Sequence, residues 1–320
     1  AVIMKNGENA VSLTSKTDYY PGGMAMPNRN VQGDYRYGYQ GEFAETDPET
    51  GKVAFELRLY DPRINRWMTT DPAGQYHSPY MSMGNNWVNQ VDPDGAYSPP
   101  STHLDEDGNV IAVYNDGDLG VYVHSNEELA GMGGIFDQGG FNSETMSLAV
   151  SGGTNRIGET QFWNEFISPE TGLAVGRIDI GGSWNNTLAA LHTKALDMDL
   201  REIASNSTRG QVFDVKANKG FAPYGGFTGK LLNGKYASAR SAGNYLAGYN
   251  GSTGTYFAAK ISWETYIKLA GAVHQGKWNK SNAFKIVTFG TSFGQAPWYG
   301  EVEYAGRQIQ QGWNHLGFKN

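Results

Sequence analysis

Five side chains in the last third of the chain have the types needed for proton transfer beside a stabilised negative charge. His274 can titrate near neutral pH and move a proton, and Glu301 or Asp214 can act as the complementary carboxylate. Lys216 and Arg240 can hold an anionic oxygen, the arginine through two parallel donors. A histidine, a cation and a carboxylate suffice for metal-free cleavage of RNA, in which a base takes the 2′-hydroxyl proton and cations stabilise the phosphorane.

Two neighbouring residues, Asn244 and Tyr245, are candidates for substrate binding. Asn244 follows Gly243 at a possible helix start, where backbone amides also face an anion. Plainer explanations remain open for several of these residues. Asn244 also suits a helix cap, and the charge of His274 at a helix end also complements the helix dipole. Asp214 and Lys216 lie two apart on one strand face, where they can simply pair with neighbours.

Aromatic side chains in the same region favour either unpaired bases or sugar rings as binding partners. Most of them are also expected in the core, because they bury large areas in a glycine-rich domain. A glycan hydrolase needs two carboxylates across a groove, and Glu301 with Asp214 is the candidate pair. A non-enzymatic adhesion or carrier module needs neither arrangement. The aromatic residues concerned are Tyr236, Tyr245, Tyr249, Tyr256, Trp263, Trp278, Trp298 and Trp313.

Charge is distributed very unevenly along the 320 residues. The net charge of −7 is made of −4 over residues 1–95, −12 over 96–208 and +9 over 209–320. A basic segment of this size suits a polyanion such as nucleic acid or an anionic cell-wall glycan, or an acidic neighbour within the chain.

Composition excludes several classes of protein. The chain has no Cys, which rules out a disulfide scaffold, a cysteine nucleophile and a thiolate metal site. No run approaches 18 apolar residues, so no transmembrane helix is expected, and no cofactor or metal is predicted. Because residue 1 is Ala and not Met, we expect the chain to be the end of a longer protein.

The elements of the first part are predicted from alternation and turn residues. Strands are expected over 36–39 and 53–60, with a turn at Asp47–Gly51 between them. Residues 96–104 are a linker by composition. A β-hairpin is expected from the β-prone runs 110–114 and 121–123. Residues 105–109 match only the first half of a calcium loop, so a plain hairpin turn is preferred there.

The later elements follow from periodicity. A loop is expected over 131–160, a helix over 186–205, a strand over 211–216 and a loop over 220–229. A short helix from Ser238 to Ala247 is expected to stop at Gly248, followed by a helix over 256–274. The last elements are a strand over 286–289 and a helix over 301–312, with Glu301 near its N-terminus.

Five motifs in order over residues 14–95 resemble the RHS-repeat-associated core, which ends the β-shell of RHS and related polymorphic toxins. The motifs are Asp18-Tyr19-Tyr20-Pro21-Gly22-Gly23-Met24, Arg36-Tyr37-Gly38-Tyr39-Gln40-Gly41, Tyr60-Asp61-Pro62-Arg63 with Arg66-Trp67, Asp71-Pro72-Ala73-Gly74 and Asp92-Pro93-Asp94-Gly95. The resemblance implies that a variable C-terminal toxin begins just after Gly95.

The same resemblance implies a reaction of the chain on itself. In RHS families with paired Asp-Pro-x-Gly motifs, the two aspartates are associated with self-cleavage just after the second motif. It therefore implies Asp71 and Asp92 as a carboxylate dyad, with cleavage near Gly95–Tyr97. Ala96 is smaller than the residue typical at that position. The alternative is that both motifs are only turns, in which the Asp caps backbone amides.

The basic region resembles the type-44 polymorphic toxin domain over about residues 209–315. The resemblance rests on three pieces: Phe213-Asp214-Val215-Lys216, the small-residue segment 234–248, and Leu269-Ala270-Gly271-Ala272-Val273-His274-Gln275.

Together the sequence predicts a β-rich shell-end fragment over 1–95 and a linker over 96–104. An acidic hairpin-and-helix region (105–208) and a basic α+β toxin domain (209–320) follow. The leading hypothesis is a secreted or cell-surface toxin delivered into a target bacterium, acting as a metal-independent nuclease on RNA. A cell-wall hydrolase and an adhesion module are the alternatives. An acidic immunity protein and the rest of the RHS shell are the expected partners.

Overall fold

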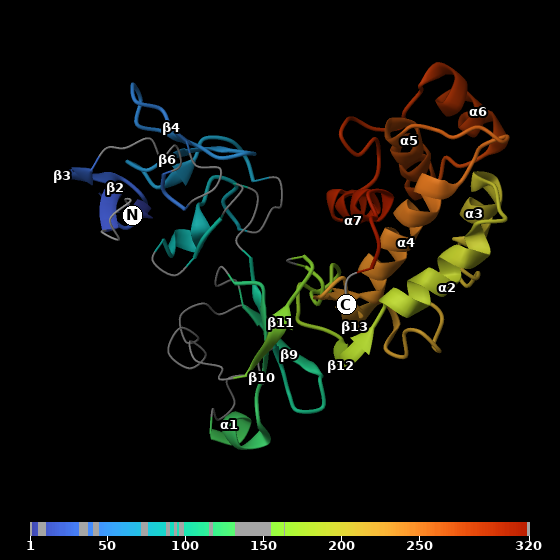
Figure 1. Cartoon of the computed structure of the whole chain (residues 1–320), viewed down its shortest axis with the longest axis horizontal. Coiled ribbons are helices and arrows are strands. Elements are labelled where there is room, and N and C mark those ends of the chain that lie inside the picture. The colour runs from blue at the N-terminus through green and yellow to red at the C-terminus, as the bar shows by residue number, and fades with distance from the viewer. Residues whose placement is uncertain are drawn as a thin grey trace. The chain divides into compact units, whose positions relative to one another are not determined.

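The computed structural model contains two compact units, which are described separately below (Figure 1). Unit 1 comprises residues 1–101 with 114–120, and unit 2 comprises 102–113 with 121–320. The structure describes residues 2–5, 11–31, 38–40, 45–71, 76–87, 90–92, 95, 99–114, 118–131, 155–162 and 164–318.

Unit 1 contains two small antiparallel sheets. One has the order β1-β2-β3 and the other β4-β5-β6-β7. The second sheet encloses a core of buried apolar side chains: Val53, Phe55, Tyr60, Trp67 and Met83. The bounds of the elements are β1 Val2–Lys5, β2 Val11–Tyr19, β3 Ala25–Val31, β4 Glu45–Thr46, β5 Val53–Ala54, β6 Leu59–Asp61, β7 Arg66–Trp67 and the 3₁₀ turn η1 Met83–Asn85.

The strand predicted over 53–60 is instead a hairpin. Strands β5 and β6 pair with Val53 opposite Tyr60, and the amide of Phe55 donates to the carbonyl of Arg58 across the turn. The predicted turn at 47–51 is confirmed, since the Asp47 carboxylate accepts from backbone amides and Gly51 has φ +69°. Of the strand predicted over 36–39, Tyr39 lies in a turn and residues 36–37 lie outside the described residues.

The first sheet of unit 2 has the order β11-β10-β8-β9, so the predicted hairpin of 110–114 with 121–123 is wrong. Strand β9 lies beside β8, and β10 crosses over to pair in parallel with β8. The preferred hairpin turn at 105–109 is confirmed: Asp105 accepts from the amide of Asn109, and Gly108 has φ +83°. The bounds are β8 Ser101–Leu104, β9 Val110–Tyr114, β10 Gly120–Val123 and β11 Arg156–Glu159.

Helices are concentrated in the C-terminal part, around a second sheet of order β12-β13-β14 (Figure 1). The bounds are α1 Asn126–Gly131, β12 Arg177–Ser183, α2 Asn185–Ala195, α3 Leu200–Asn206, η2 Gly225–Phe227, β13 Thr228–Leu232, β14 Lys235–Ser238, α4 Ala239–Thr253, α5 Trp263–His274, α6 Lys280–Phe289 and α7 Glu303–Trp313. Of the loop predicted over 131–160, residues 156–159 form β11 and 132–154 lie outside the described residues.

Three elements predicted for unit 2 differ in the structure, for reasons found in their local hydrogen bonds and packing. The helix predicted over 186–205 is two helices, because Asp199 forms a capping box that starts α3. The strand predicted over 211–216 is a series of turns, in which Phe213 and Val215 alternate into the core without a strand partner. The strand predicted over 286–289 is the end of α6, which Asn279 caps and Gly290 terminates.

Close helix contacts explain the remaining corrections. Gly248 does not stop α4: a Cβ there would lie 1.8 Å from the Ile309 carbonyl oxygen, so the glycine allows α7 to approach. The helix expected over 256–274 begins only at Trp263, after the Ser262 cap. The last helix begins at Glu303, so Glu301 precedes it.

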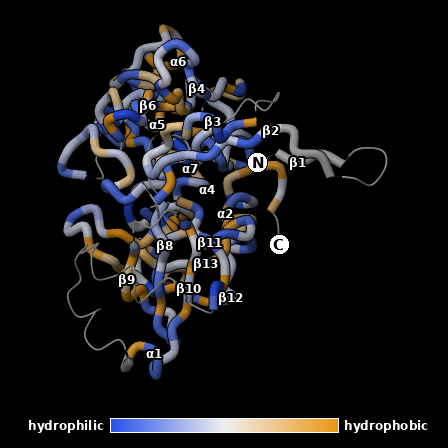
Figure 2. The backbone as a smooth tube through the Cα atoms, turned by 90° about the vertical axis from the view of Figure 1, so that its left-hand side faces the viewer, coloured by the Kyte–Doolittle hydropathy of each residue, from blue (hydrophilic) through white to orange (hydrophobic). Residues whose placement is uncertain are grey.

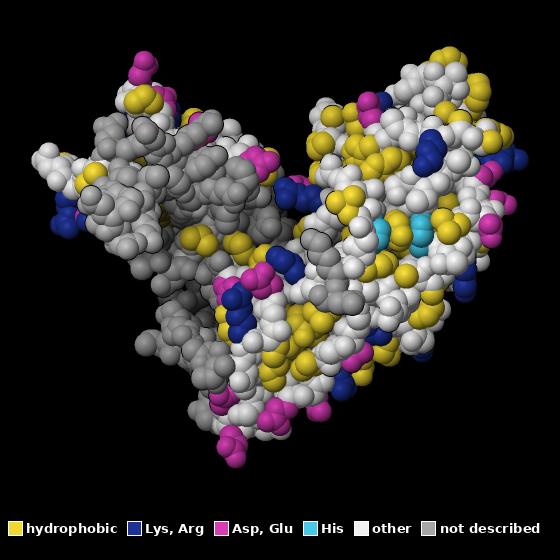
Figure 3. Space-filling model, in the orientation of Figure 1, with side chains coloured by type: hydrophobic (Ala, Val, Ile, Leu, Met, Phe, Trp, Pro, Cys, Tyr) yellow, Lys and Arg dark blue, Asp and Glu magenta, His cyan; other side chains and the backbone are white. Residues whose placement is uncertain are grey.

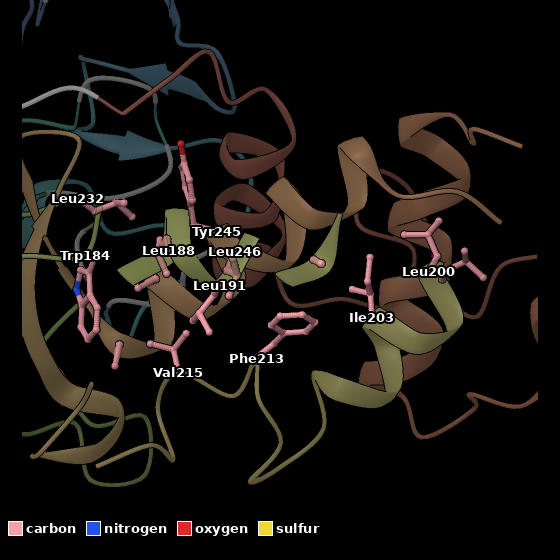
Figure 4. Close-up of a cluster of buried hydrophobic side chains, with 14 of the residues drawn as sticks. Trp184, Leu188, Leu191, Leu200, Ile203, Phe213, Val215, Leu232, Tyr245 and Leu246 are labelled. Atoms are coloured by element: carbon pink, nitrogen blue, oxygen red, sulfur yellow. The ribbon is translucent and has the colours of Figure 1, made fainter. Parts of the chain in front are cut away.

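The largest core cluster of unit 2 joins segments from both sides of residue 208. Figure 4 shows Leu188 and Leu191 of α2 beside Leu246 of α4, with Phe213 and Val215 close by. In Figure 2, apolar and polar residues alternate along the tube. No helix within the described residues is both long and apolar enough to cross a membrane.

Candidate functional site

In unit 1 one buried arginine contacts both aspartates of the Asp-Pro-x-Gly motifs. The Arg58 guanidinium lies 2.8 Å from Asp92 Oδ2 and 3.4 Å from Asp71 Oδ1. All three side chains are at most 2% exposed. The hairpin turn between β5 and β6 positions Arg58, and its guanidinium lies 4.2 Å from the centre of the Trp67 ring. The structure therefore brings the two predicted aspartates to one site.

The same arginine also binds the backbone at the end of the second motif. Arg58 Nε donates to the carbonyl oxygen of Gly95. Gly95 is buried and has φ +77°, and a Cβ there would lie 2.8 Å from Cβ of Phe55, so only glycine fits. The guanidinium can thus polarise a peptide carbonyl beside two carboxylates. Residues 96–98, where cleavage is predicted, lie outside the described residues.

Arg58 was not selected from the sequence. A charged residue between Leu57 and Leu59 was the available signal, because an arginine inside an apolar run is rarely buried without partners.

In unit 2 the predicted His274 and Glu301 lie in contact. His274 Nδ1 lies 2.9 Å from Glu301 Oε1, and the histidine side chain is 41% exposed against 8% for the glutamate. Gly271, one turn before His274 on α5, makes this approach possible: a Cβ at Gly271 would lie 2.2 Å from the Tyr299 carbonyl oxygen. Gln275 Nε2 also donates to the Gly300 carbonyl at 2.7 Å.

Electrostatics distinguish Glu301 from the surface carboxylates. Burial raises the pKa of Glu301, and the Val302 amide and the charges of His274 and Lys216 partly offset that rise. A largely buried carboxyl with a raised pKa beside an exposed histidine can exchange a proton near the surface. Lys216, which is exposed, contributes through its charge and not through a direct bond in the described structure.

The other predicted residues of unit 2 lie in different contacts. The buried Asp214 carboxylate accepts from the amide of Gly210 at 2.8 Å. Arg240 donates to the carbonyls of Asn164 and Glu165, and its guanidinium lies 4.2 Å from the Phe227 ring centre. Asn244 lies inside α4 and donates to Gln308 Oε1 at 2.7 Å, so the expected helix start and its amide anion site are wrong.

Glu165 is a buried carboxylate that was not predicted from the sequence, and its backbone carbonyl is one of the two that Arg240 binds. Glu165 is 1% exposed and accepts from the amide of Ser238 at 2.8 Å and from the hydroxyls of Ser241 and Tyr304. Burial raises the pKa of Glu165. The signal was a carboxylate among apolar residues, since Phe162, Trp163, Phe166 and Ile167 surround it in the sequence. The carboxylate of Glu165 accepts its hydrogen bonds from within unit 2, and these bonds hold residues 164–166 against α4 and α7.

Tyr245 belongs to a second cluster that was also missed. Its hydroxyl lies 2.6 Å from His315 Nδ1 and accepts from Asn233 Nδ2 at 3.0 Å. Tyr249 stacks on His192 with ring centres 3.6 Å apart, and its ring is tilted against that of His315 at 4.0 Å. Tyr245 is 4% exposed and meets the His315 ring edge-on, so it is a packed core residue. No group of three metal-binding side chains occurs among the described residues.

Comparison with known proteins relates about a quarter of the chain to two much longer proteins. Over 80 residues, 24% of this chain and 2% of the relative, it is 42% identical to "Salivary gland surface protein 1" of Aedes aegypti. Over 90 residues, 26% of this chain and 9% of the relative, it is 37% identical to "Toxin subunit YenC1" of Yersinia entomophaga. The chain thus spans less than a tenth of the length of either relative. No protein family and no solved structure matches the chain.

Proposed function

We propose that this chain is part of an RHS-type toxin and cuts itself after its second Asp-Pro-x-Gly motif to release residues 96–320, which contain unit 2. The observation that carries the proposal is the buried Arg58, which contacts Asp71, Asp92 and the Gly95 carbonyl together. The partial similarity to a toxin subunit supports it. The released unit is then the effector, and its expected partners are the remaining shell and an acidic immunity protein in the producing cell.

The proposed reaction is hydrolysis of the Gly95–Ala96 peptide bond. A water oxygen bonds to the Gly95 carbonyl carbon while Arg58 stabilises the negative charge on the carbonyl oxygen. One aspartate takes the proton from the water and passes it to the departing nitrogen of Ala96, as the carbon–nitrogen bond breaks. Glycine at position 95 allows the backbone to lie against Arg58 and Phe55.

Purified full-length chain tests this proposal directly. We expect two fragments with a new N-terminus at Ala96, identified by intact-mass spectrometry, and an intact chain for Asp71→Asn and Asp92→Asn. Asp61→Asn is the matched control, because Asp61 is also buried but pairs with the exposed Arg63. A wild-type chain that stays whole, or an Asp92→Asn chain that is still cut, contradicts self-cleavage.

For the effector we propose metal-independent cleavage of RNA at His274 and Glu301. The specific observation behind it is the 2.9 Å contact of these residues together with the charge of Lys216. His274 takes the 2′-hydroxyl proton, Glu301 holds the resulting imidazolium, and Lys216 stabilises the phosphorane. The glycan-hydrolase alternative has less support, since the Asp214 carboxylate is buried against Gly210.

RNA incubated with the protein in the presence of EDTA distinguishes these outcomes. Products should carry 2′,3′-cyclic phosphate ends, and His274→Ala should lower the rate by about 100-fold or more. Glu303→Gln, two residues from Glu301 but paired with Arg307 on α7, should cleave at the wild-type rate. If His274→Ala keeps full activity, His274 is not the base. If RNA stays intact with a folded protein, the nuclease proposal fails.

A further inference from the structure

Two buried histidines join the first two parallel strands of unit 2. His103 on β8 and His124, directly after β10, are each 1% exposed. Nδ1 of His103 lies 2.7 Å from Nε2 of His124, and the rings stack with their centres 5.0 Å apart. A backbone hydrogen bond also links the two segments, because the amide of His124 donates to the carbonyl of Leu104 at 2.9 Å. Strands β8 and β10 are therefore linked by both side chains and backbone.

The contact between the two rings depends on their protonation. One proton between the facing nitrogens satisfies both, since one ring donates and the other accepts. A second proton would set two N–H groups against each other at hydrogen-bond distance, in a site with little water to screen the charges. Acid therefore converts this contact from attraction to repulsion.

Few titratable groups face this pair in the described part of the chain. Glu128 of α1 places Oε2 3.9 Å from His124 Nδ1, and the ring of Tyr122 on β10 stacks on His103 at 5.3 Å. Glu128 is partly exposed and also accepts from the amide of Ser125. Burial, followed by the charge of His124, lowers the pKa of His103 to about 3. Burial lowers the pKa of His124 too, and Glu128 opposes that shift.

We propose that His103 and His124 form an acid-sensitive latch, which holds β8 against β10 at neutral pH and releases β8 on acidification. Both histidines bind protons more weakly in the folded state than in the unfolded chain, so the closed latch is fully stable above pH 6.5. Its stability falls as the pH drops below that value. This inference follows from the sheet alone and holds whether or not the chain cleaves itself.

A consequence for the released effector rests on the proposed function. Strand β8 is the first strand after Gly95 in the sequence, so it would be the N-terminal strand of the freed part. Acid would then loosen that part at its N-terminal strand.

Amide hydrogen exchange on the full chain tests the latch. The measured quantity is the opening constant, the ratio of observed to intrinsic exchange rate, for amides of β8 and β10 between pH 7.5 and 4. We expect the opening constant to rise below about pH 6, by about tenfold per pH unit for each histidine that gains a proton on opening. Amides in the middle of α4 should keep a constant value, which would show that the opening is local.

Variants identify the responsible groups. His103→Asn places an amide near the former Nδ1 and cannot titrate, so the pH slope in β8 should lose the contribution of one proton, and His124→Gln should act in the same way. The double variant should lose the slope altogether. His77→Gln, which changes an exposed histidine of unit 1, should keep the wild-type slope. The proposal is overturned if the wild-type opening constants do not change with pH. It is also overturned if the double variant retains the slope, or if α4 opens with the same slope as β8.

Discussion

The position of Arg58 decides how Asp71 and Asp92 can act. The Arg58 guanidinium contacts one oxygen of each carboxylate, Asp71 Oδ1 and Asp92 Oδ2. The two carboxylates are therefore linked through a cation that also binds the Gly95 carbonyl. The turn explanation of the motifs does not account for a buried arginine that reaches both of them.

The charge of Lys216 should change the pKa of the Glu301 carboxyl measurably. Lys216 lowers the pKa of Glu301, so Lys216→Gln should raise that pKa further above its usual value of 4.5. Carboxyl ¹³C NMR titration of the full chain measures this shift. Lys219→Gln, three residues on, should leave it unchanged.

The raised pKa of Glu301 also determines how this group affects stability as the pH changes. The folded state binds the Glu301 proton more tightly than the unfolded chain, so this group favours folding below pH 4.5 and the benefit is lost as the pH rises through its folded pKa. A Lys216→Gln titration that matches the wild type would place Lys216 too far from Glu301 to stabilise charge there.

At the scale of elements, two glycines set the approach of α4 to α7. Gly248 faces the Ile309 carbonyl, and a Cβ at Gly312 would lie 1.9 Å from the carbonyl oxygen of Tyr245. Backbone contacts cannot move aside as a flexible side chain would. Gly248→Ala should therefore lower the free energy of unfolding by about 1–3 kcal/mol or more, as in other overpacked cores.

Gly243 on the same helix gives the matched control for this prediction. A Cβ there would meet only Cβ of Val215, at 3.9 Å, which is an ordinary contact. Gly243→Ala should stabilise the protein by about 0.5–1 kcal/mol, because alanine loses less backbone entropy in a helix. Urea unfolding measures both changes, and a Gly248→Ala protein as stable as Gly243→Ala would show that the two helices are not closely packed.

Local turn and cap chemistry was more predictable from sequence than strands were. The Asp47–Gly51 and Asp105–Asn109 turns follow from residues whose side chains bind their own backbone. Phe213 and Val215 alternate like a strand because both pack into the core from a series of turns. A strand also needs a neighbouring strand to pair with, which the spacing of apolar residues does not reveal. The contact between His274 and Glu301 could not be predicted, because it depends on the close backbone approach at Gly271. The contacts of Arg58 with both aspartates could not be predicted either, because they depend on a hairpin where the sequence predicted a single strand.

At the scale of the whole molecule, unit 2 places the acidic and basic parts of the chain in one body. The predicted boundary at residue 208 falls inside this unit, and the core cluster draws buried residues from both sides of it. Figure 3 shows Lys and Arg side chains of unit 2 interspersed with Asp and Glu on the face in view. The +9 of residues 209–320 therefore lies beside acidic groups of the same unit, which weakens attraction to a polyanion and makes binding more dependent on the site itself.

This arrangement predicts that residues 209–320 do not fold alone. The fragment lacks Trp184, Leu188, Leu191, Leu200 and Ile203 of the core, the β12 partner of β13, and Glu165. Burying five such side chains contributes on the order of 10 kcal/mol, which is comparable with the whole stability of a domain.

The two fragments should differ clearly in solution. Residues 102–320 should give a dispersed ¹H–¹⁵N spectrum and one cooperative urea transition, whereas 209–320 should give collapsed amide shifts and no cooperative transition. Cooperative unfolding of 209–320 would show that the core before residue 208 is dispensable. The predicted outcome makes the effector a unit that begins near the proposed cleavage point, because a cut after Gly95 keeps every buried partner of α4 and α7 on one fragment.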